Sequence, residues 1–134
     1  MIQQSQEQQR TQQKSSEKYV LIAAQDEGLR ALLKIAIVLE TPYSAYTVSS
    51  GKDALYVATT MHFDLFLLDF HLRDISGLKL YENLHTTPGL EDIPAVIFTT
   101  SSNTDELNIN LPMLIEEPFE LDELFEKLSH FLAS

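Results

Sequence analysis

The hydrophobic positions of this chain fall into short continuous runs that alternate with longer segments of helical periodicity. A strand covered on both faces is apolar throughout, whereas a helix with one buried face repeats its apolar residues every three or four positions. Such alternation is typical of right-handed βαβ units, which build a parallel sheet. The pattern therefore predicts an α/β domain with a doubly wound sheet. The predicted strands are residues 19–24, 45–49, 64–69, 94–100 and 112–116.

Helices are predicted between these strands and after the last one, at residues 26–40, 51–61, 77–85 and 120–133. Asp26, Ser50 and Ser76 are the expected N-caps of the first three, because their side chains accept N–H groups of a first helical turn. Residues 101–111 leave room for only one or two turns, so the helix before the last strand is predicted to be shortened. The last helix is amphipathic, with one apolar face formed by Leu121, Leu124, Phe125, Leu128, Phe131 and Leu132.

The first 17 residues differ in composition from the rest of the chain. They contain seven glutamines and almost no apolar side chains. Such a segment buries too little surface to offset the entropy lost on ordering. We therefore expect a disordered leader at residues 1–17 and one folded domain at residues 18–134. The alternative is a helix that forms only against a partner, because Gln, Glu and Lys favour helices.

Composition and charge exclude several classes of protein. The absence of cysteine excludes disulfides and cysteine-based zinc sites. The formal net charge of −11 repels phosphates, so no nucleic acid partner is expected. No apolar run is long enough to span a membrane and no signal peptide is visible, so a cytoplasmic protein is expected. The glycines form no phosphate-binding loop and the histidines lack metal-ligand spacing, so no enzyme is expected.

One carboxylate ends an otherwise apolar strand in the sequence FDLFLLDFHLRD, residues 63–74. Asp69 follows the apolar run 65–68. In open α/β sheets, ligands bind at the carboxyl ends of the strands, near the point where the strand order reverses. Asp69 is therefore a candidate functional residue. The alternative is a structural carboxylate that caps a turn or the next helix.

Three motifs make residues 18–134 resemble a response-regulator receiver domain. They are FDLFLLDFHLRDISGLKL (63–80), IPAVIFTT (93–100) and EPFELDELFEKL (117–128), of which the first is the most specific. The resemblance implies a flavodoxin-like, CheY-like fold with five strands in the order 2-1-3-4-5. It also implies that Asp69 accepts a phosphoryl group, for which a carboxylate is a usable nucleophile. Thr99 would then contact that phosphoryl group.

The residues after the first strand depart from the family pattern. Ala24 and Gln25 stand where two carboxylates belong, and in the family those carboxylates hold Mg²⁺. An alanine side chain donates no ligand, and a glutamine offers one neutral carbonyl. The weak candidates for holding a metal ion without those two carboxylates are Asp26, Asp69 and the backbone carbonyl of His71. No metal or other cofactor is therefore expected.

Two positions near the last strand also depart from the family pattern. Glu117 stands where a lysine pairs with the acceptor carboxylate, so the sign of the charge is reversed. A phosphoryl group would increase the repulsion, because it adds about −1.5 to −2 of charge. Leu114 stands where the family has an aromatic residue on the last strand. In the family this aromatic residue responds to the movement of the hydroxyl residue, which is Thr99 here.

These departures predict a pseudo-receiver, which is a single-domain regulator in two-component (phosphorelay) signalling that binds proteins without Mg²⁺-dependent phosphorylation. One alternative is a true receiver phosphorylated on Asp69 by a histidine kinase, and only this alternative uses Mg²⁺. A remote alternative is a flavodoxin-like domain that binds a small molecule or catalyses a reaction. The expected partner is a histidine kinase or another signalling protein. A homodimer that forms through the apolar residues within 107–115 is a further alternative.

Overall fold

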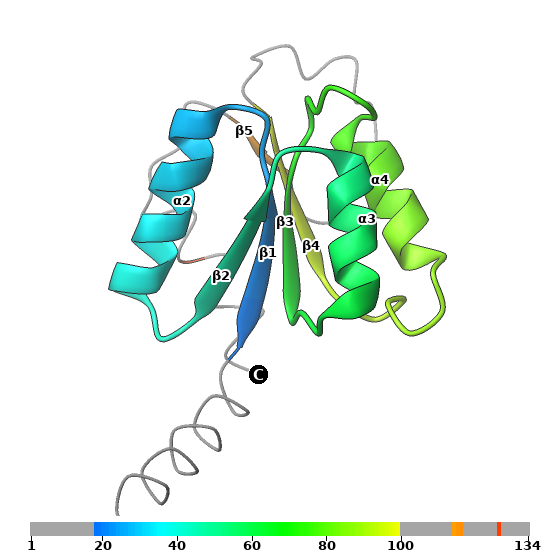
Figure 1. Ribbon diagram of the computed structural model, residues 1–134, viewed down its shortest axis with the longest axis horizontal. Coiled ribbons are helices and arrows are strands. Elements are labelled where there is room, and N and C mark those ends of the chain that lie inside the picture. The colour runs from blue at the N-terminus through cyan, green and yellow to red at the C-terminus, as the bar shows by residue number, and fades with distance from the viewer. Residues whose placement is uncertain (1–17, 100–113, 117–125, 127–134) are drawn as a thin grey trace, which may run out of the picture.

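The strands and helices of this chain form an open α/β sheet with helices on both faces (Figure 1). The computed structural model describes residues 18–99, 114–116 and 126. The predicted α/β architecture is confirmed, and the described ends of the elements lie close to the predicted ones. Along the chain the elements are β1 (Tyr19–Ala23), α2 (Glu27–Glu40), β2 (Ser44–Val48), α3 (Gly51–Thr60), β3 (Leu65–Asp69), α4 (Gly77–His85), β4 (Ala95–Thr99) and β5 (Leu114–Glu116).

The strands pair in parallel in the order β2-β1-β3-β4-β5, which is the order that the resemblance implied. From β1 the chain moves outward to β2 and then crosses back past β1 to β3. The strand order therefore reverses between β1 and β3, and the carboxyl ends of these two strands flank the reversal. Ala23 pairs with Leu68 in the register of β1 and β3, so Asp69 emerges just beyond the end of β1.

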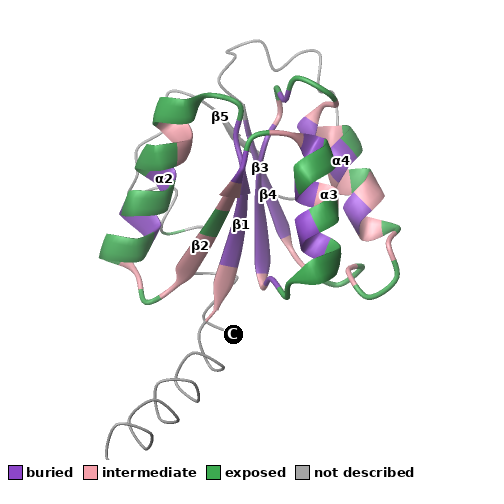
Figure 2. Cartoon of the chain, in the orientation of Figure 1, coloured by how far each residue is buried: buried purple, intermediate pink, exposed green. Residues whose placement is uncertain are grey.

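The two faces of the sheet carry separate hydrophobic clusters, because successive side chains of a strand point to opposite faces. Every residue of β3 is buried (Figure 2). Leu65 and Leu67 pack on one face with α2. Phe66 and Leu68 pack on the other face with α3 and α4. This double cover explains why β3 is apolar along its length and why a charge appears only at its end.

The helices begin where the sequence predicts. Asp26, Ser50 and Ser76 are the N-caps of α2, α3 and α4, and each side chain accepts the N–H of the residue three positions further along the chain. These bonds satisfy donors that a first helical turn leaves free. Within the described ranges, no helix is long and apolar enough to cross a membrane.

Several predictions fall outside the described residues. They are the leader at residues 1–17, the shortened helix within residues 101–111, most of the helix at residues 120–133, and Glu117. These stay predictions from the sequence.

Candidate functional site

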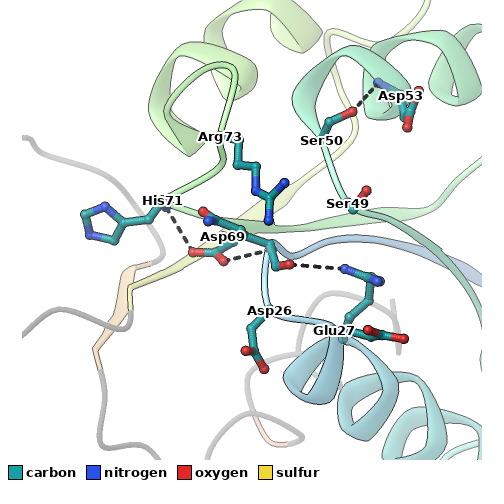
Figure 3. Close-up of a pocket in the computed structure, with 10 residues that line it drawn as sticks. Asp26, Glu27, Ser49, Ser50, Asp53, Asp69, His71 and Arg73 are labelled. Atoms are coloured by element: carbon teal, nitrogen blue, oxygen red, sulfur yellow. Dashed lines mark hydrogen bonds between the residues drawn. The ribbon is translucent and has the colours of Figure 1, made fainter.

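The carboxyl edge of the sheet holds a pocket of about 810 Å³ among the turns that follow β1, β2 and β3 (Figure 3). These turns bring together residues that are distant in the sequence. Most of the lining side chains are polar or charged, which favours a polar ligand or a polar contact with a partner. The lining residues include Gln25, Asp26, Arg30, Ser49, Asp69, His71 and Arg73.

Asp69 is the buried carboxylate of this pocket. Its exposed fraction is 3%, and no other charged residue in the described part of the chain is buried. The His71 N–H donates to Oδ1 at 2.9 Å, and the Gln25 N–H donates to Oδ2 at 3.2 Å. Each carboxylate oxygen thus accepts a main-chain donor, and such bonds to a charged acceptor are stronger than neutral ones.

Burial and hydrogen bonding shift the pKa of the Asp69 carboxyl in opposite directions. Burial raises the pKa of this carboxyl, while the N–H groups of His71 and Gln25 and the nearby His71 ring lower it, and Asp26 raises it. The net effect is a pKa above the ordinary value of 3.8. The charged form of Asp69 is therefore less favourable in the folded chain than in the unfolded chain.

This raised pKa gives a pH-dependent prediction for Asp69→Asn, a variant that cannot titrate at this position. The folded wild type binds its proton more tightly than the unfolded chain, so its stability falls as pH rises from below 3.8 through the folded pKa of Asp69. We expect the free energy of unfolding of the wild type to fall relative to that of the variant over this interval. Urea unfolding of both proteins at a series of pH values measures the difference. A difference that is constant, or that grows with pH, would contradict the prediction.

The described residues do not fit the Mg²⁺ that the receiver family implies. Ala24 is buried and has no ligand atom. The Asp26 carboxylate is engaged as the cap of α2, where it accepts the Leu29 N–H at 2.7 Å. Among the residues placed by the structure, no three His, Cys, Asp or Glu side chains are grouped so that they could hold a metal ion. A divalent cation needs several oxygen ligands, and within the described ranges Asp69 is the one carboxylate at the position that the family pattern implies.

Two arginines lie at the pocket in different roles. Arg30 of α2 donates from Nη1 to the carbonyl of Ala24 at 2.9 Å and to that of Gln25 at 3.3 Å, so it fixes the backbone that follows β1. Arg73 is exposed, and Figure 3 shows its side chain directed into the pocket above Asp69. In the described part of the chain, Arg73 forms no ion pair.

The loop between β3 and α4 is held close to the end of β3. The Gly77 N–H donates to the carbonyl of Phe70 at 2.8 Å, and His71 and Ser76 form an isolated bridge. A Cβ on Gly77 would lie 2.4 Å from the carbonyl oxygen of Asp69. The Ser-Gly pair of the motif therefore has two separate functions, because Ser76 caps α4 and Gly77 lets the helix start against the backbone of Asp69.

Asp74 is a residue of this loop that the sequence reasoning missed. Its carboxylate accepts the N–H groups of Gly51 at 2.9 Å, Lys52 at 2.8 Å and Ile75 at 3.0 Å. Burial acts to raise the pKa of Asp74, but these N–H groups outweigh it and lower the pKa. An acidic residue shortly before a Ser cap was the signal available in the sequence, but the sequence does not show that this acid reaches a different helix.

The other predicted family positions are only partly described. Thr99 ends β4, where its backbone pairs with Glu116, and Leu114 pairs with Ile97. The hydroxyl contact of Thr99 and the effect of Leu114 rest on side chains outside those described, and Glu117 follows β5 outside the described range. The structure thus brings Ala24, Gln25, Asp69 and His71 together, while the remaining positions stay predictions from the sequence.

Comparison with known proteins identifies a protein family whose model matches this chain. The model of the response regulator receiver domain matches residues 20–129. The response regulator ArlR of Staphylococcus aureus is 26% identical in an alignment of 117 residues, which covers 84% of this chain and 52% of that protein. This chain therefore spans about half the length of the curated relatives that it matches.

Solved structures show the same fold. The response regulator TrrA of Thermotoga maritima, in complex with Mg²⁺-BeF, has a TM-score of 0.76 and 25% identity, covering 86% of this chain and 99% of that one. The chemotaxis response regulator CheY4 of Vibrio cholerae has a TM-score of 0.77 and 17% identity, covering 87% of this chain and 100% of that one. Because the family model spans most of the sequence and the fold agrees, this chain belongs to the family of response regulator receiver domains, which act in two-component signalling.

Proposed function

We propose that this receiver domain is a pseudo-receiver, which contacts its protein partner in the unmodified state and is not phosphorylated by the Mg²⁺-dependent route. The observation that carries the proposal is the environment of Asp69. The residues that follow β1 offer this carboxylate the buried methyl group of Ala24 and the N–H of Gln25. The next carboxylate along the chain, that of Asp26, is engaged as the cap of α2, where it accepts the Leu29 N–H at 2.7 Å.

The sequence supports the same conclusion at a second position of the family pattern. Glu117 stands where the family has a lysine. Two unit charges about 4 Å apart interact by roughly 4 kcal/mol at an effective dielectric constant of 20. Exchanging attraction for repulsion at such a distance disfavours a phosphorylated Asp69, because the phosphoryl group adds negative charge. The Mg²⁺-BeF complex of TrrA shows what that receiver binds, and the donor set at Asp69 here does not support the same ligand.

The alternative is a receiver that a histidine kinase phosphorylates on Asp69. The observation that favours this alternative is the open pocket of about 810 Å³ beside Asp69, which a phosphodonor can enter. A small molecule could enter the same pocket, which is the argument for a ligand-binding domain of this fold. Among the described residues that line the pocket, the four acids Asp26, Glu27, Asp53 and Asp69 outnumber the two arginines, Arg30 and Arg73. The remaining negative charge disfavours an anionic phosphodonor.

Intact-mass spectrometry of the chain after incubation with a small phosphodonor and Mg²⁺ tests the proposal. We expect no phosphoryl adduct, because the described residues supply no cation site beside Asp69. Asp69→Ala is the control for adducts at other positions. An adduct present on the wild type and absent from this control would favour the alternative.

A further inference from the structure

The carboxylate of Asp74 links the β3–α4 loop to the first turn of α3. Oδ1 accepts the Gly51 N–H at 2.9 Å, and Oδ2 accepts the Lys52 N–H at 2.8 Å. These two donors precede Asp74 by 23 and 22 residues. Oδ1 also accepts the Ile75 N–H of its own loop at 3.0 Å. One side chain therefore ties together two turns at the carboxyl edge of the sheet.

This link is separate from the ordinary capping of α3. Ser50 is the N-cap of the helix, and its Oγ accepts the Asp53 N–H at 3.1 Å. The first turn of a helix has further free donors, and Asp74 takes those of Gly51 and Lys52. Removing Ser50 Oγ weakens the helix start and leaves the link to the loop in place. Removing the Asp74 carboxylate weakens the helix start and also cuts the link.

Packing strengthens the same connection. Ile75 is partly buried against the core cluster that α3 and α4 share. A Cβ on Gly51 would lie 2.5 Å from Cγ1 of Ile75, so the loop lies directly on the first residue of α3. Asp74 and Ile75 thus fix one end of a short loop whose other end begins at Asp69.

The loop fixed in this way carries one of the two N–H groups that donate to Asp69 within the described part of the chain. The His71 N–H donates to Oδ1 of Asp69 at 2.9 Å. His71 itself is exposed, and its ring is edge-on to Phe70 with centroids 5.0 Å apart. The position of its backbone therefore depends on how the loop is held and not on burial of the imidazole.

We propose that Asp74 is a positioning residue, which anchors the β3–α4 loop to α3 and thereby keeps the His71 N–H on the carboxylate of Asp69. The anchored loop gives the unmodified domain one fixed arrangement of Asp69, His71 and Arg73. The proposal that a protein partner binds this fixed arrangement of side chains rests on the proposed function. The anchoring itself does not.

The experiment compares Asp74→Ala with Ser50→Ala, because both changes remove acceptors from the start of α3 and only the first cuts the link. Two NMR readouts are measured on the full chain, namely hydrogen exchange of the His71 amide and titration of the Asp69 carboxyl carbon. In Asp74→Ala we expect the His71 amide to exchange at least about tenfold faster, since its hydrogen bond opens more often. The midpoint of the Asp69 titration should rise, because a donor to the charged form is lost.

Ser50→Ala should leave both readouts at their wild-type values. Among the described residues, His71 and Asp26 are the other titratable groups that act on Asp69, and neither is substituted in either variant. Wild-type values in Asp74→Ala, or equal changes in both variants, would overturn the inference. Should Asp74→Ala not fold, Asp74→Asn keeps one acceptor oxygen. Faster His71 exchange in that variant supports the inference, and a wild-type rate overturns it.

The two proposals fail in different measurements. An unchanged His71 amide in the Asp74 variants refutes the positioning role and leaves the pseudo-receiver proposal standing. A phosphoryl adduct on Asp69 refutes the pseudo-receiver proposal and leaves the anchoring of the loop standing.

Discussion

Replacing Gly77 with alanine should lower the free energy of unfolding by about 3 kcal/mol, the upper part of the usual cost of overpacking. The added methyl carbon would lie 2.4 Å from the Asp69 carbonyl oxygen and 2.8 Å from Cα of Phe70. Both neighbours are backbone atoms, so a side-chain rotation cannot relieve the contact. Either α4 or the end of β3 must move, and the second movement displaces Asp69. Urea unfolding measures the loss.

Gly28→Ala is the matched control for this substitution. Gly28 also lies in the first turn of a helix, but it is exposed, and its added Cβ would meet only a side-chain oxygen of Asp26 at 3.3 Å. The Asp26 carboxylate, which caps α2, must shift slightly, and alanine favours a helix by up to about 1 kcal/mol over glycine. This variant should therefore lose much less stability than Gly77→Ala. Equal stability of Gly77→Ala and the wild type would refute the close packing of α4 on β3.

Replacing Leu67 with alanine should cost about 2–5 kcal/mol, which is the range for a large-to-small change at a buried site. Leu67 is fully buried at the centre of β3, on the face covered by α2. The strand has neighbours in the sheet on both sides, so the surrounding backbone cannot easily collapse into the space. Denaturant unfolding monitored by circular dichroism measures the change.

Leu39→Ala removes the same atoms from an exposed position. Leu39 lies on the outer side of α2 with an exposed fraction of 75%. Surface changes of this kind usually stay within about 0.5 kcal/mol. The prediction is therefore a large difference between two identical substitutions, and similar losses at both positions would contradict the burial of β3 under α2.

The strands were predictable from the sequence because each central strand is covered on both faces. The apolar run of β3 has no polar residue until Asp69, and the structure buries every one of its positions. The caps of α2, α3 and α4 were predictable for a different reason, since each cap bonds within its own turn. Local chemistry of this kind is visible in a few neighbouring residues.

The contacts that shape the site were harder to predict. The Gln25 donor to Asp69 is a backbone N–H, and almost any residue at that position would supply it. Asp74 reaches α3 across more than twenty residues, and no local pattern shows which turn it meets. Arg30 donates to the backbone carbonyl of Ala24 after β1. Every residue has such a carbonyl, so the sequence does not show which one accepts. The place of Asp69 at a strand end made it a candidate functional residue, and the resemblance to receiver domains implied its phosphoryl-accepting role. Its hydrogen-bond partners could not be predicted without the fold.

The proposed pseudo-receiver function requires that Asp69 lies in a receiver fold without the cation site needed for phosphorylation. The most direct test sets the wild type beside a repaired variant that carries Ala24→Asp, Gln25→Asp and Glu117→Lys, with both proteins given a small phosphodonor and Mg²⁺. Intact mass is read for each and for its Asp69→Ala form. We expect a phosphoryl adduct on the repaired chain only, and we expect this adduct to be lost when Asp69 is replaced. A phosphoryl adduct on the wild type that is also lost in Asp69→Ala would contradict this expectation.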